Sequence, residues 1–169
     1  MPRWRPLLSF VLVLAGCDPG GGMGIDAGPD AMVPEARVEL GTGTSTFVAL
    51  PATGAELELV HGPQGGYHVF VTARLYGLEP EGLSLTFDAA DADTGAAVGH
   101  RTAIGLVAAR VQREGDHYVR AGDILILDDG NPDNVRGHTL DVTVTATEAD
   151  TGRSASDHRV ALIVDNEGG

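Results

Sequence analysis

The sequence predicts an all-β fold, an antiparallel β-sandwich of about eight strands. Two observations predict it. Apolar and polar residues alternate with a period of two from residue 36 onward, and Gly, Pro, Asp and Asn turn signals separate the alternating runs. No segment of a dozen residues carries a helical stripe, and residues 103–111 come nearest to one.

Each strand follows from its own pattern. Residues 55–59, 83–88 and 140–147 alternate strictly, which places one face on a core and the other in water. Residues 67–76 and 124–127 are apolar on both sides, a pattern typical of central strands buried on both faces. Turn signals stand between these runs, at residues 62–66, 79–82, 93–95, 129–132 and 150–152.

The last two runs add a resemblance. The Thr-rich run 140–147, the turn around Asp150-Thr151-Gly152 and the returning run 154–164 resemble the closing strand pair of immunoglobulin-like and fibronectin-III-like bacterial domains. This resemblance implies an immunoglobulin-like sandwich for residues 35–169. It implies no function, because that architecture serves many.

The first sixteen residues read as an export signal. Arg3 and Arg5 precede an apolar run at residues 7–15, and small residues follow before the lone cysteine. The run is too short to span a bilayer, which takes about 20 apolar residues. The motif Leu14-Ala15-Gly16-Cys17 resembles the lipobox of bacterial lipoproteins. The resemblance implies cleavage before Cys17, acylation of Cys17, and attachment to the inner or outer membrane of the cell envelope.

Composition limits the partners. Residues 17–34 are rich in Gly, Pro and Asp and predict a flexible tether. Without residues 1–16 the net charge becomes −15, because the leader removes two arginines and no acid. Such a chain is repelled by nucleic acid and by anionic headgroups. With Cys17 acylated, no thiol remains for a disulfide, so the fold must rest on its apolar core.

Two histidines flank a distinctive turn. The segment Gly62-Pro63-Gln64-Gly65-Gly66-Tyr67-His68 suits a β-turn at residues 62–65, and it resembles segments in lipoproteins of GC-rich soil bacteria. One hypothesis is that His61 and His68 bind Cu or Zn, for which imidazole is a suitable ligand. A third ligand would come from the remaining histidines: His100, His117, His138 or His158. The alternative is that His68 only supports the start of a strand.

Two oxygen-rich segments raise the question of a hard cation. Asp128, Asp129 and Asp133 could contribute to a Ca²⁺ loop, because Ca²⁺ takes six to eight oxygens from flexible loops. A second acidic run begins at Asp88 and passes through Asp91, but it fails the EF-hand spacing. The alternative in both places is a polar turn whose Asx side chains bond their own backbone.

Catalytic signatures are missing from the sequence. It has no Gly-x-Ser-x-Gly elbow and no His-Glu-x-x-His motif. We therefore expect a non-catalytic binding or structural module that needs no cofactor and meets an envelope protein or ligand through loops at one end of the sandwich. A periplasmic transition-metal-binding protein is the second hypothesis.

Overall fold

The computed structural model describes residues 34–128 and 131–166. The expected leader (1–16), Cys17 and the expected tether up to residue 33 lie outside the described residues. Across the described ranges the chain forms eleven strands and two short 3₁₀ helices, and no α-helix. No helix in these ranges is long and apolar enough to cross a membrane.

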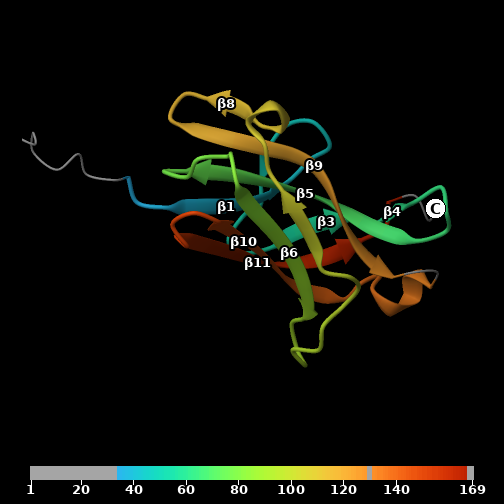
Figure 1. Ribbon diagram of the computed structural model, residues 1–169. Coiled ribbons are helices and arrows are strands. Elements are labelled where there is room, and N and C mark those ends of the chain that lie inside the picture. Colours follow the sequence, from blue (N-terminus) through green and yellow to red (C-terminus); the bar gives the residue numbers. More distant parts are fainter. Residues whose placement is uncertain (1–33, 129–130, 167–169) are drawn as a thin grey trace, which may run out of the picture. The chain divides into compact units, whose positions relative to one another are not determined.

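The strands form two sheets (Figure 1). The first sheet has the order β2-β1-β5-β9-β8, with β4 also paired to β5. Its strands are β1 (Arg37–Thr42), β2 (Val48–Ala49), β4 (Val60–His61), β5 (Tyr67–Tyr76), β8 (Gln112–Glu114) and β9 (His117–Asp128). The second sheet has the order β3-β11-β10-β6-β7. Its strands are β3 (Ala55–Glu58), β6 (Leu83–Asp91), β7 (Thr102–Gly105), β10 (Thr139–Glu148) and β11 (Ser154–Val164).

This strand order is that of an immunoglobulin domain. Strands β1, β5, β9 and β8 take the places of A, B, E and D, while β6, β10 and β11 take those of C, F and G. Strand β7 extends the second sheet as C′ does in variable-type domains. All pairings are antiparallel except one, in which β3 runs parallel to β11 and covers its free edge. The predicted β-sandwich is confirmed.

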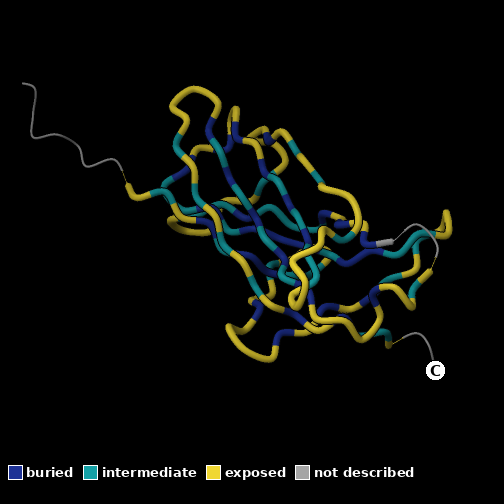
Figure 2. Tube along the Cα trace, turned by 90° about the horizontal axis from the view of Figure 1, so that it is seen from below, coloured by how far each residue is buried: buried dark blue, intermediate teal, exposed yellow. Residues whose placement is uncertain are grey.

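The core lies between the two sheets, where the buried tube segments of Figure 2 run. Inner positions follow the alternation of the sequence: β5 contributes Val69, Val71, Ala73 and Leu75, and the inward residues of β6 and β10 interleave with them. Phe87 and Leu85 of β6 have no exposed surface at all. Every buried member of this core lies between Val38 and Ile163.

Residues 103–111, the segment nearest to a helical stripe, form most of strand β7 and the 3₁₀ turn Ala108–Arg110. One sequence expectation needs correction. Residues 124–127 are buried on one face only, because Ile124 is 43% exposed and Ile126 is 39% exposed. The run is apolar on both sides, yet nothing among the described residues covers its outer side fully.

Polar bonds close the seam where β1 crosses β11. Asp157 and Arg159 occupy inward positions of β11, where an apolar residue would continue the core. The Asp157 carboxylate instead accepts the backbone N–H of Leu40 in β1 at 2.8 Å and contacts the Arg159 guanidinium. Arg159 also donates to the backbone carbonyl of Leu50 at 3.3 Å. Buried polar groups are thereby paired, as burial requires.

The register places the loops at two opposite ends. Strand β1 begins beside the last residue of β5, because Arg37 pairs with Tyr76. The "β1 end" therefore carries the loops 77–82, 115–116 and 149–153. The "pocket end" carries the loop 62–66 and the loop that precedes β10. Figure 1 shows β1 entering at one side of the sandwich and β4 lying at the other.

We expect Leu85→Ala to lower the free energy of unfolding by about 2–5 kcal/mol, because it leaves a cavity in a packed core. Leu162→Ala is the matched control: Leu162 is 38% exposed on the outer face of β11, so its loss should cost under about 1 kcal/mol. Urea denaturation of both variants measures the difference. Equal losses would show that the inner face of β6 does not carry the core.

Candidate functional site

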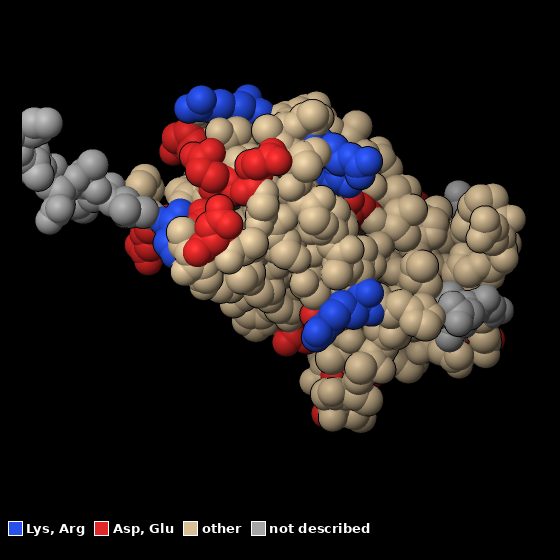
Figure 3. Space-filling model, viewed as in Figure 1, with Lys and Arg blue, Asp and Glu red and all other residues tan. Residues whose placement is uncertain are grey.

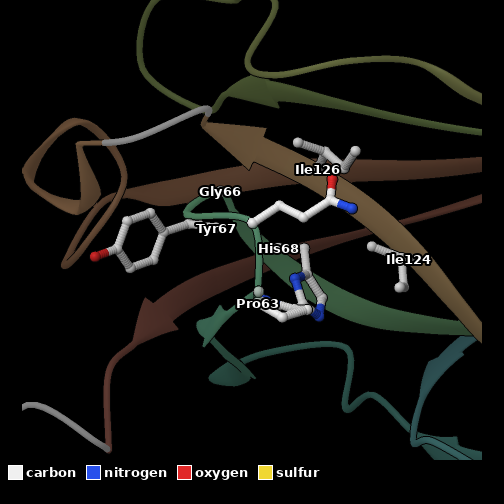
Figure 4. Close-up of a pocket in the computed structure, with 8 residues that line it drawn as sticks. Pro63, Gly66, Tyr67, His68, Ile124 and Ile126 are labelled. Carbon is white, nitrogen blue, oxygen red and sulfur yellow. The ribbon is translucent and has the colours of Figure 1, made fainter.

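A pocket of about 300 Å³ opens at the pocket end, on the outer face of the first sheet (Figure 4). The loop between β4 and β5 forms one wall, and β9 contributes Ile124 and Ile126. In the register, Phe70 pairs with Ile124 and His68 pairs with Ile126, so all four side chains share this outer face. The lining residues are Gly62, Pro63, Gln64, Gly66, Tyr67, His68, Ile124 and Ile126.

The loop that forms the wall is set by its glycines. Gly65 N–H donates to the Gly62 carbonyl at 3.0 Å, which confirms the turn predicted at residues 62–65. Gly65 adopts a φ of +93°, a conformation that side chains other than glycine rarely take. Gly62 N–H then bonds the Gly66 carbonyl at 2.8 Å and closes the loop onto the start of β5.

His68 lies at the base of this pocket and is 91% buried by the surrounding groups, with 9% of its surface exposed. Its ring packs edge-to-face on Phe70, with centroids 5.2 Å apart. Burial lowers the pKa of His68 below its ordinary value, so the imidazole is neutral at pH 7. Among the described residues, the buried side-chain atoms without a hydrogen-bond partner are Arg74 Nε and His117 Nε2, so the ring nitrogens of His68 are not sealed from the pocket. Figure 4 shows the ring among the pocket-lining side chains.

The structure does not bring His61 and His68 together. His61 pairs with Tyr67 across the β4–β5 hairpin, and their rings stack with centroids 4.9 Å apart. Tyr67 and His68 are neighbours in one strand, so their side chains leave on opposite faces, as Figure 4 shows for this pair. The two histidines proposed as a Cu or Zn pair therefore face opposite sides of the hairpin.

The other histidines are spread over the fold, and several contact carboxylates. His117 Nδ1 lies 3.1 Å from Asp116 at the β1 end, and His158 Nδ1 lies 3.1 Å from Asp141 on the outer face of the second sheet. His138 Nδ1 lies 3.7 Å from Asp91 beside β10, while His100 donates its backbone N–H to the Ile126 carbonyl at 2.9 Å. Within the described ranges, no group of three or more His, Cys, Asp or Glu side chains could hold a metal ion.

The oxygen-rich segment near residue 130 is held by arginine. Asp129 and the side chain of Asp128 lie outside the described residues. Asp133 contacts Arg136 at 3.2 Å, and Arg136 also donates to Asp165 at 2.8 Å. The Asp133 backbone N–H is capped by the Asn131 side chain at 3.1 Å. Asp133 thus serves a capped 3₁₀ turn and an ion pair in this structure.

The acidic run at Asp88 and Asp91 forms turn and strand contacts. Asp88 accepts a hydrogen bond from Arg101 at 2.6 Å. Asp91 accepts the Thr94 hydroxyl at 2.7 Å and the Thr94 backbone N–H at 2.8 Å. These two bonds lower the pKa of Asp91. The arrangement is an Asx-type turn, in which a side-chain oxygen binds its own loop.

The β1 end holds a second pocket, of about 400 Å³, which Glu148 and Arg153 help to line. Arg153 donates to the Gly77 carbonyl at 2.7 Å and to the Pro34 carbonyl at 3.2 Å. Its Nη2 lies 2.7 Å from Glu148 Oε1, and Thr151 donates to Glu148 at 2.5 Å. Arg153 first and Thr151 second lower the pKa of Glu148 to about 2. One guanidinium therefore ties the β10–β11 turn, the β5–β6 loop and the start of the described chain.

Charge is distributed unevenly between the ends. On the face seen in Figure 3, acidic and basic side chains gather toward the β1 end and the middle, and few charged side chains are visible at the opposite end, which is mostly tan. The described residues that line the pocket beside His68 include no Asp, Glu, Lys or Arg. Sequence reasoning singled out His68 and the loop but missed Ile124 and Ile126. The only sequence signal for these two residues was that both are apolar and stand at strand positions whose side chains face outward.

Comparisons with known proteins add no function. No protein-family model and no curated protein matches this chain.

The Glu148–Arg153 contact predicts a pH dependence. Because the folded protein holds the pKa of Glu148 below its ordinary value, the contact stabilises the fold fully above about pH 4.5. That stabilisation is lost as the pH falls from about 4.5 to about 2. We expect Glu148→Gln to lower the free energy of unfolding by roughly 1–3 kcal/mol at pH 7. The variant should also lose less stability than the wild type as the pH falls from about 4.5 to about 2.

Denaturation midpoints measured between pH 7 and pH 2 test the pH dependence. Glu58→Gln, at an exposed position of β3 far from Arg153 in the register, is the control and should keep the wild-type profile. If Glu148→Gln loses stability as steeply as the wild type between pH 4.5 and pH 2, the Glu148–Arg153 contact is not the source of the pH dependence.

Proposed function

We propose that the protein is a lipid-anchored protein of the bacterial cell envelope, and that its sandwich is a non-catalytic binding module. The observation that carries the anchor is the motif Leu14-Ala15-Gly16-Cys17, in which the only cysteine of the chain follows a short apolar run. The observation that carries the binding role is the pocket beside His68, at the end of the sandwich opposite the start of β1.

Acylation would give a stable anchor. Each buried CH₂ group contributes about 0.8 kcal/mol, and two or more chains hold a protein where one chain alone is marginal. The mature chain carries a charge of −15, so attraction to anionic headgroups does not assist it. The acyl groups on Cys17 are therefore the source of membrane affinity in this proposal.

The order of the expected tether and β1 supports one orientation of the sandwich relative to the membrane. Residues 17–34, as a flexible tether, would reach roughly 20–25 Å on average, and β1 would follow shortly after it. The β1 end is then the end nearer the membrane, and Arg153 and Glu148 already occupy it. In antibody variable domains the B–C and F–G loops at this end bind antigen. A pocket lies at each end, about 300 Å³ beside His68 and about 400 Å³ at the β1 end, and in this assignment the one beside His68 would face away from the membrane.

A binding role fits the pocket better than catalysis does. Among the described lining residues, His68 and Tyr67 are the only titratable ones, and Figure 4 shows the Tyr67 ring turned away from the His68 ring. Acid–base or nucleophilic chemistry needs a second positioned group within hydrogen-bond reach. The acidic net charge likewise argues against nucleic acid as the partner.

Substituting Cys17→Ala should abolish acylation and release the protein from membranes, because no other group of the chain resembles an acylation site. Metabolic labelling with an alkyne analogue of palmitate, followed by membrane fractionation, measures both effects. Asp26→Ala, within the expected tether, is the control and should remain labelled and membrane-bound. A Cys17→Ala protein that stays fully in the membrane fraction would overturn the anchor.

A further inference from the structure

We propose that the pocket beside His68 binds a small uncharged organic ligand that combines an apolar ring or branched group with one hydrogen-bonding group. The inference deepens the proposed binding role and rests on it. Four features of the pocket carry it: its charge, its accessible imidazole, its exposed isoleucines and its size.

The charge of the pocket selects a neutral ligand. The chain carries a net charge of −13, yet none of the eight described residues that line the pocket is Asp, Glu, Lys or Arg. Burial lowers the pKa of His68, so the imidazole supplies no positive charge at pH 7. An ionic ligand would leave water without gaining a counter-ion, which is costly in an apolar recess.

The imidazole calls for a hydrogen-bonding group. His68 is buried to nine-tenths of its surface, and it lines the pocket. Its ring nitrogens are not among the buried atoms that lack a hydrogen-bond partner in the described residues, so they are open to the pocket, where water or a ligand can reach them. A neutral imidazole offers one donor and one acceptor, and Gln64 adds an amide at the rim. A ligand hydroxyl or amide would satisfy the ring without introducing charge.

The isoleucines call for an apolar group. Ile124 and Ile126 are 43% and 39% exposed, and they lie in the second half of β9, beyond the residues that pair with β8. Their side chains and Pro63 enclose the imidazole on the pocket side, as Figure 4 shows. Covering such surface releases about 25 cal/mol per Å² of apolar area, which favours an apolar ligand face here.

The size of the pocket limits the ligand to a small molecule. A volume of about 300 Å³ stands at the lower limit of ligand pockets, which run from about 300 to 1,000 Å³. The loop 62–66 rises beside β9 and bounds the recess, so a flat protein surface would not reach the imidazole. One ring or one branched chain with a polar head fits these bounds.

Three phenyl probes of similar size test the charge requirement: benzamide, benzoate and benzylamine are neutral, anionic and cationic at pH 7. The protein is the full chain with Cys17→Ala, labelled at its isoleucine methyl groups and followed by NMR. We expect benzamide to shift the Ile124 and Ile126 methyl signals in a saturable manner at millimolar concentration. Benzoate and benzylamine should bind at least tenfold more weakly.

Two variants test the residues. His68→Phe keeps a ring on Phe70 but removes the nitrogens, and it should weaken benzamide about threefold to tenfold, which corresponds to one lost hydrogen bond. Ile126→Asp should abolish binding. Leu162→Asp places the same charge at an equally exposed strand position on the other sheet, and it should leave binding unchanged.

Several results would overturn the inference: a charged probe that binds as tightly as benzamide, no saturable shift at either isoleucine in a folded protein, or full affinity in Ile126→Asp. These results are distinct from a failure of the anchor, which the membrane fraction of the Cys17→Ala protein reports. A ligand failure with the anchor intact would leave an anchored sandwich whose pocket does not bind this class of molecule.

Discussion

The pairing register of β5 is the constraint on which the rest of the structure depends. Its odd-numbered residues from Val69 to Leu75 form the centre of the core, and its even-numbered residues from His68 to Tyr76 form the outer face of the first sheet. A slip of one residue against β9 would exchange these faces and expose the core. The same register puts His68 opposite Ile126 and Phe70 opposite Ile124, so it also creates the pocket.

The two ends of the sandwich are specialised by their chemistry. At the β1 end, Arg153 bonds Glu148 and two backbone carbonyls, which fixes the loops that an antibody domain would use for binding. At the pocket end, the wall is a glycine-rich loop and the floor is an uncharged face. The core between them is apolar and complete within residues 38–163, so the arrangement needs no disulfide. An exported chain whose only cysteine is acylated has no thiol left for a disulfide, and a core of this kind could hold its fold.

The sequence predicted the architecture well because alternation acts locally. In residues 140–147 each side chain's face follows from its parity, and β10 and β11 pair around the turn that the sequence indicated. The outer surface was harder to predict. Whether Ile124 and Ile126 are covered depends on segments distant in sequence, and periodicity does not contain that information. The relation of His61 to His68 was also hidden, because it depends on the pairing of His61 with Tyr67 across a five-residue loop. Spacing alone suggested a pair, and the register placed the rings on opposite faces.

The central claim is that the anchored sandwich holds its pocket end away from the membrane. The acylated protein can be placed in liposomes that contain nitroxide-labelled lipid, with a fluorophore on a single added cysteine at Gln64→Cys or at Asp150→Cys. Gln64 lies at the pocket end and Asp150 in the turn at the β1 end. The account predicts strong quenching at position 150 and weak quenching at position 64. Equal quenching at the two positions, or the reverse order, would contradict it.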